Sequence, residues 1–168
     1  MQYQFVANNP FAVLTAIVAP AILTNACSVL ALGTSNRLGR VVDRTRVVAS
    51  DIAVSKPGSE GFLEWNSQMR ALETRTHMLL RALRLFYAAL GLFASSALIS
   101  VAGSIAAFYG QRPLFQAGAL LAVVTGGSAV LGLSAGCFTM VSETRLAVKS
   151  LAEESKMRIK LHDVKKTD

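Results

Sequence analysis

The sequence predicts an all-α membrane protein with three transmembrane helices. Three long segments of the 168-residue chain, 1–36, 85–111 and 113–142, contain no Asp, Glu, Lys or Arg. Each exceeds the roughly 20 apolar residues that an α-helix needs to cross a hydrocarbon core of about 30 Å. A helix in a soluble protein rarely stays uncharged for so long, because one of its faces normally meets water. Charged residues make up only 16% of the chain, against about 25% in soluble domains.

We expect the spans at about 11–35, 85–109 and 114–142, within a single membrane domain that covers 1–168. Pro20 lies in the middle of the first span. In a membrane bundle the carbonyl that it frees can find other partners, so a kink is expected rather than a break.

The charges indicate how the chain is oriented. Sixteen of the seventeen Lys and Arg residues and all ten acids lie in 37–84 and 143–168, which gives these two segments a net charge of +6. The positive-inside rule therefore places the N-terminus outside, and 37–84 and the C-terminus in the cytoplasm. This excess of positive charge suits contact with anionic phospholipid. No nucleic-acid-reading motif accompanies it, so a nucleic-acid partner is not expected.

Segment 37–84 is predicted to form a cytoplasmic antiparallel helical hairpin. The cluster of helix-breaking residues at 55–61 indicates a turn, and Ser59 is a suitable N-cap for the helix that follows. This second helix, about 60–109, carries an apolar seam at alternating spacings of three and four residues, typical of a coiled coil: Phe62, Trp65, Met69, Leu72, Thr76, Leu79, Leu83 and Phe86. We expect it to pair with an apolar seam on the continuation of the first helix: Leu38, Val41, Val42, Thr45, Val48 and Ile52. The tail, 143–168, is predicted to be a basic helix that ends near residue 161.

Polar side chains in the first span are the candidates for lining a pore. At about 100° per residue, Thr24, Ser28 and Ser35 fall on one side of the helix, and Asn25 lies at its flank. This stripe avoids lipid either by packing against another helix or by facing a water-filled pore. An amide at membrane depth needs hydrogen-bond partners, which makes Asn25 the more informative residue of the four.

Three arginines directly after the first span, Arg37, Arg40 and Arg44, also share one helix face. One interpretation is that they anchor the topology, with their side chains reaching up to the membrane surface. Binding of an anion or a lipid phosphate is a second interpretation, and salt bridges between subunits are a third.

The sequence carries no signature of an enzyme, a metal site or a cofactor. Motifs of metalloproteases, serine hydrolases, phosphate-binding loops and dinucleotide folds are missing. Cys27 and Cys137 lie inside predicted spans without a CxxC pattern, and small apolar filler is the favoured role for both. Small residues recur every four positions on two faces of the third span: Gly118, Ala122 and Gly126 on one, and Ser128, Gly132 and Gly136 on the other. This pattern predicts close neighbours on both sides of the helix and hence a homo-oligomer.

Two motifs, PAILTNAC at 20–27 and NRLGRVVDRTR at 36–46, resemble the signature of a bacterial membrane family, domain of unknown function 2721. The segment SETRLA at 142–147 matches the ending of that family's third span. The resemblance covers about 11–152 and implies a small multi-pass protein of the bacterial inner membrane. It brings no catalytic residues with it.

Two functions follow as hypotheses. The first is a homo-oligomeric channel or pore, lined by the first span, with a basic inner mouth formed by the arginines. The alternative is a membrane scaffold or regulatory subunit whose cytoplasmic hairpin binds a partner protein or anionic lipid. The expected partners are thus a second copy of the chain, anionic phospholipid and a cytoplasmic protein.

Overall fold

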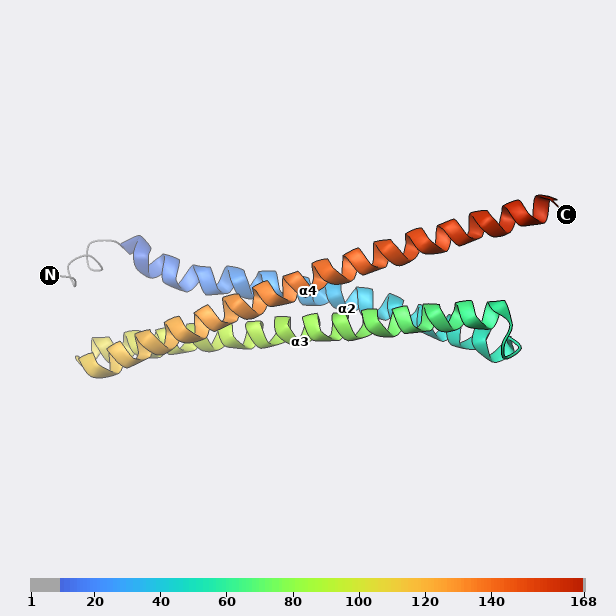
Figure 1. The fold of residues 1–168 in the computed structure, drawn as a ribbon. Helices are drawn as coiled ribbons and strands as arrows, with labels where there is room; N and C mark the ends of the chain where they lie inside the picture. Colours follow the sequence, from blue (N-terminus) through green and yellow to red (C-terminus); the bar gives the residue numbers. More distant parts are fainter. Residues whose placement is uncertain (1–9, 168) are drawn as a thin grey trace. The chain divides into compact units, whose positions relative to one another are not determined.

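A computed structural model describes residues 10–167 as three long α-helices: α2 (Pro10–Val54), α3 (Glu60–Phe108) and α4 (Arg112–Thr167) (Figure 1). No β-strand occurs in this described part of the chain. Each helix contains a stretch that is long and apolar enough to cross a membrane. The predicted all-α fold with three candidate spans is confirmed.

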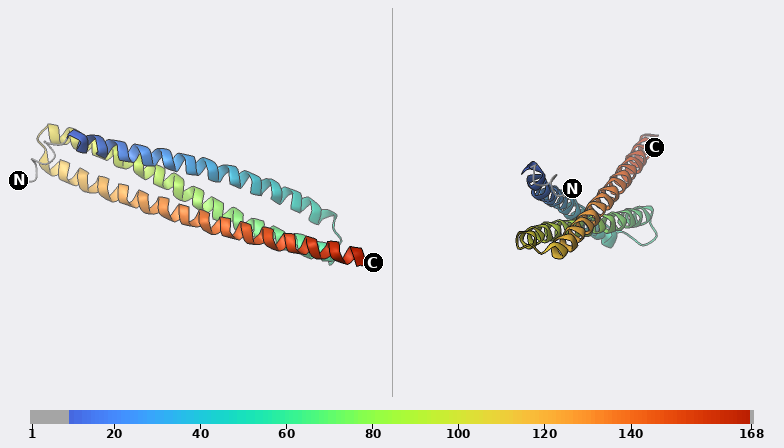
Figure 2. Two further views of the ribbon diagram at one scale, coloured as in Figure 1. Left: turned by 90° about the horizontal axis from the view of Figure 1, so that it is seen from above. Right: turned by 90° about the vertical axis from the view of Figure 1, so that its left-hand side faces the viewer.

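Short connections join opposite ends of α3 to the other two helices, as Figures 1 and 2 show. At the start of α3, the backbone N–H of Phe62 donates a hydrogen bond of 3.3 Å to the hydroxyl of Ser59, which is the predicted N-cap. Gly58 and Gly110 provide the left-handed backbone conformations of the two turns, with φ of 86° and 75°. The last helix runs to Thr167, past the predicted end near residue 161.

Contacts divide the chain into two compact units. Within the described chain, the apolar unit contains residues 10–33 and 83–136, and the arginine unit contains residues 34–82 and 137–167.

The apolar unit has a core of small and aromatic side chains. Cys27, Ala89, Phe93 and Ala129 are buried together, with four leucines packed around them. The small residues of α4 allow it to approach α3 closely. The hydroxyl of Ser96 on α3 donates a hydrogen bond of 2.8 Å to the backbone carbonyl of Ala122.

Glycines from both small-residue faces of α4 contact α3 of the same chain. A methyl group placed on Gly118 would lie 3.5 Å from the Cα of Gly103, and one on Gly136 would lie 2.6 Å from the ring of Phe86. The expectation that the two faces serve different neighbours is therefore wrong for these glycines. A homo-oligomer stays a prediction, and its support must come from another surface.

The arginine unit is built on the two predicted seams. Val41 and Val48 of α2 are buried against Leu72 and Leu79 of α3. Partly buried side chains complete this core: Leu38, Ile52, Trp65, Met69 and Met140. Met140 belongs to α4, so this third helix packs against one side of the hairpin core. Charged residues of α4 thereby come close to the hairpin.

Candidate functional site

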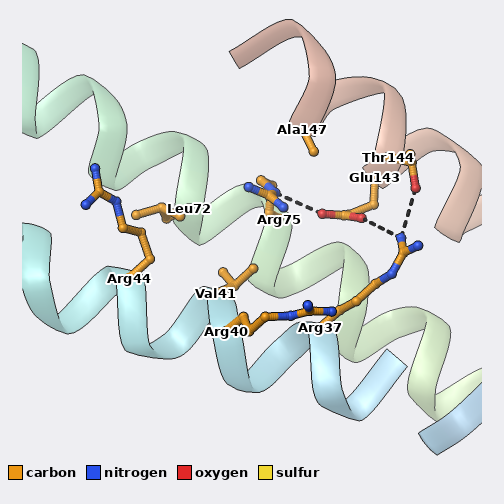
Figure 3. A pocket seen from close by; sticks show the side chains of 9 residues that line it. All are labelled: Arg37, Arg40, Val41, Arg44, Leu72, Arg75, Glu143, Thr144 and Ala147. Carbon is orange, nitrogen blue, oxygen red and sulfur yellow. Dashed lines mark hydrogen bonds and ion pairs between the residues drawn. The ribbon is translucent and has the colours of Figure 1, made fainter. Parts of the chain in front are cut away.

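The arginine unit contains an open pocket of about 390 Å³ to which all three helices contribute (Figure 3). Four arginines and one carboxylate are among the nine residues that line it. The complete lining is Arg37, Arg40, Val41, Arg44, Leu72, Arg75, Glu143, Thr144 and Ala147. The spacing of three and four residues places Arg37, Arg40 and Arg44 on one face of α2. The structure thus brings the three predicted anion-binding residues to one site.

Glu143 of α4 is the central acceptor of the pocket and is only 2% exposed. Its two carboxylate oxygens contact different helices. Oε1 accepts a hydrogen bond of 2.8 Å from Nε of Arg75 on α3, and Oε2 lies 3.7 Å from Nη1 of Arg37 on α2. A buried carboxylate is costly unless such partners compensate its lost hydration. These two arginines therefore allow Glu143 to be buried as a charged group.

Arg37 is held by a second contact from α4. Its Nη1 donates a hydrogen bond of 3.1 Å to the hydroxyl oxygen of Thr144, which itself donates a hydrogen bond of 2.9 Å to the backbone carbonyl of Met140. Figure 3 shows Glu143 and Thr144 both directed at the guanidinium of Arg37. The position of Arg37 is thus set by two acceptors on one helix, although its side chain remains 46% exposed.

Arg40 and Arg44 add two further positive charges to the lining of the pocket. In Figure 3, Arg40 extends along α2 towards Arg37, and Arg44 extends on the other side towards Leu72. Both side chains are exposed. The lining carries four positive charges and one negative charge, a net charge of +3. This arrangement suits an anion, and guanidinium groups bind phosphate oxygens through paired N–H donors.

Among the described residues, no cluster of three or more His, Cys, Asp or Glu side chains could hold a metal ion. The groups that line the pocket are suited to binding and orienting an anion through charge and hydrogen bonds.

None of the four pore-lining candidates of the first span belongs to the lining of the pocket. Thr24 is half-buried, whereas Asn25, Ser28 and Ser35 are exposed on α2. The hydroxyl of Ser28 donates a hydrogen bond of 3.0 Å to the carbonyl of Thr24 in its own helix. Whether these residues line a pore stays a prediction.

Sequence reasoning missed three members of the pocket: Arg75, Glu143 and Thr144. A signal for Arg75 was present, because it lies three residues after Leu72 and four before Leu79, on the side of α3 that carries the hairpin seam. From the sequence, Glu143 is only the first charged residue after the third span and a member of the SETRLA motif. Its burial depends on arginines that are 68 and 106 residues away in the chain, and no local pattern contains them.

Residues 17–153 match the family model described as "Protein of unknown function (DUF2721)". The chain belongs to this family. The match contains the whole pocket, from Arg37 to Ala147, and confirms the resemblance noted in the sequence. No curated protein and no solved structure matches the chain.

Proposed function

We propose that this DUF2721 protein is a non-enzymatic membrane scaffold or regulatory subunit whose four-arginine pocket binds the phosphate group of an anionic phospholipid. One observation carries the proposal: four arginines from two helices line one open pocket, whose single carboxylate is paired with two of them. Arginines that line one pocket attract an anion through their summed positive charge.

The place of the pocket in the sequence supports a lipid ligand. Arg37 follows the uncharged run 1–36 directly, and Glu143 follows the uncharged run 113–142 directly. Arg44 lies seven residues beyond Arg37, about 10 Å further along a helix. The headgroup layer on each side of a bilayer is roughly 5–8 Å thick, so these arginines would lie at and just beyond the depth of the phosphates.

The proposed setting is the inner membrane of a bacterium, with the N-terminus outside and the pocket and C-terminus in the cytoplasm. The distribution of Lys and Arg supports this orientation. There the pocket would face an anionic leaflet, and the hairpin of α2 and α3 would be accessible to a cytoplasmic partner protein.

Lipid selectivity of the purified full-length protein tests the proposal. Native mass spectrometry in mild detergent would compare retention of phosphatidylglycerol with that of phosphatidylcholine. We expect the wild-type protein to prefer phosphatidylglycerol, and the double variant Arg40→Ala/Arg44→Ala to lose about tenfold of that preference, since hydrogen bonds to charged groups contribute about 1.5–3 kcal/mol before screening by water.

The matched control is Arg46→Ala/Arg70→Ala, which removes the same charge from exposed positions outside this pocket. It should retain most of the preference. An equal loss in both double variants would show that only the overall charge attracts lipid. A wild-type protein that retained the two lipids equally would contradict the proposal directly.

A homo-oligomeric pore is the second candidate function, and the exposure of Asn25, Ser28 and Ser35 favours it. In this case several copies of α2 would surround a water-filled path with the arginines at its inner mouth. Liposomes that contain the pure protein should then conduct ions, and Asn25→Leu should lower the flux. Absence of flux under every gradient would exclude this function.

A further inference from the structure

The outward face of the first span carries a second feature that lipid binding does not use. Five side chains of α2 at alternating spacings of four and three residues are all exposed in the apolar unit: Val18, Ile22, Asn25, Val29 and Leu32. The apolar members are 41–64% exposed. At about 100° per residue, the five fall within an arc of roughly 80°. We name this set the Asn25 stripe.

The Asn25 stripe points away from the core of its own unit. Cys27, which is fully buried, lies about 200° around the helix from Asn25. Close packing with α3 and α4 therefore occupies the opposite side of α2. The stripe has the spacing of a coiled-coil seam, yet no helix of the described chain covers it.

Lipid is a poor cover for the middle of this stripe. Twelve residues separate Asn25 from Arg37, about 18 Å along the helix, which places the amide near the midplane of a hydrocarbon core about 30 Å thick. Among the residues that the structure describes, none forms a hydrogen bond with the Asn25 side chain. Lipid chains offer no donor or acceptor, so the amide loses its hydration without compensation.

We propose that the Asn25 stripe is the interface between two copies of this chain, joined at its centre by hydrogen bonds between their Asn25 side chains. A carboxamide carries both donors and an acceptor, so two identical amides can satisfy each other across a two-fold axis. Ile22 and Val29 flank the amide with bulky apolar surface. They suit tight helix packing and disfavour a water-filled path at this position. A single Asn within an apolar seam also fixes the register of the paired helices.

Cysteine cross-linking in native-like lipid tests the position of the interface. In a Cys27→Ala/Cys137→Ala background, single cysteines at positions 25, 29 and 32 should form disulfide-linked dimers under mild oxidation. Ala26→Cys is the matched control, because Ala26 is also exposed but lies about 100° around the helix. Equal cross-linking at positions 25 and 26 would overturn the proposal. So would rapid labelling of Asn25→Cys by a charged, water-soluble thiol reagent, since that result indicates a water-filled path.

Dimer affinity measured by fluorescence energy transfer in liposomes tests the role of the amide. Asn25→Val should weaken dimerisation by about 3- to 30-fold, from the measured range for one or two interhelical hydrogen bonds in membranes. Ser28→Ala, which removes a hydroxyl already bonded within its own helix, should leave the affinity unchanged. A wild-type protein that stays monomeric, or an Asn25→Val variant that dimerises as strongly as wild type, would overturn the proposal. Neither result depends on whether the arginine pocket binds lipid.

Discussion

Glu143 is the residue on which the geometry of the arginine pocket depends. It is almost fully buried, and its two oxygens contact arginines from two other helices. It therefore has two opposing effects. It holds Arg37 and Arg75 in place, and its negative charge lowers the attraction of the pocket for an external anion.

Replacing Glu143 by Gln should separate these two effects. We expect the free energy of unfolding to fall by about 1–3 kcal/mol, because hydrogen bonds between charged groups become weaker ones. Anion binding should become tighter, because the net charge of the lining rises from +3 to +4. On the same preparation, thermal unfolding measures the change in stability and phosphatidylglycerol retention measures the change in anion binding. Glu73→Gln, at an exposed position outside this pocket, is the control. If Glu143→Gln lowered both the stability and the affinity for phosphatidylglycerol, Glu143 would not compete with the bound anion.

Close approach of α3 and α4 is the main packing feature of the apolar unit. Glycine and serine at the contact let the two backbones come near each other, as membrane helices commonly require. The contact is not uniform along the helices. Among the glycines of α4, Gly136 leaves the least room for a side chain, because the fully buried ring of Phe86 fills that space.

The substitution Gly136→Ala should therefore destabilise the helix pair. The added methyl group would lie 2.6 Å from the ring of Phe86, which cannot move into solvent, and overpacking of this kind typically costs about 1–3 kcal/mol. Gly127→Ala is a matched control, because nothing lies within 4 Å of the added methyl group there. Circular dichroism during heating in detergent should show a lower midpoint for Gly136→Ala alone. Equal midpoints for the two variants would contradict the close packing.

Orientation in the membrane is a property of the whole chain. The proposed topology places both charged segments on one side, and the N-terminus and the turn between α3 and α4 on the other. In this topology, Glu143 and Arg37 would lie at the same leaflet.

Labelling of single cysteines in intact cells measures this topology. In a variant without Cys27 and Cys137, we expect Gln111→Cys to react with a membrane-impermeant maleimide from outside. Ser50→Cys and Lys149→Cys, both at exposed positions, should react only after the membrane is permeabilised. Labelling of positions 50 and 149 from opposite sides would contradict the orientation and would remove the basis for a cytoplasmic lipid site.

Local sequence alone determined three features of the fold. Long uncharged apolar runs determined the three helices, helix-breaking residues the turn at 55–61, and the spacing of apolar residues the seams of the hairpin. The reason is that membrane insertion and helix formation depend on local composition and on periods of three to four residues. The grouping of Arg37, Arg40 and Arg44 on one face was predictable for the same reason. The pocket itself was decided by tertiary structure, because its carboxylate comes from α4 and its fourth arginine from α3. No pattern within one helix specifies which side chains of the other two will face it. For the same reason, the sequence predicted different neighbours for the two small-residue faces of α4, whereas glycines of both faces pack against α3.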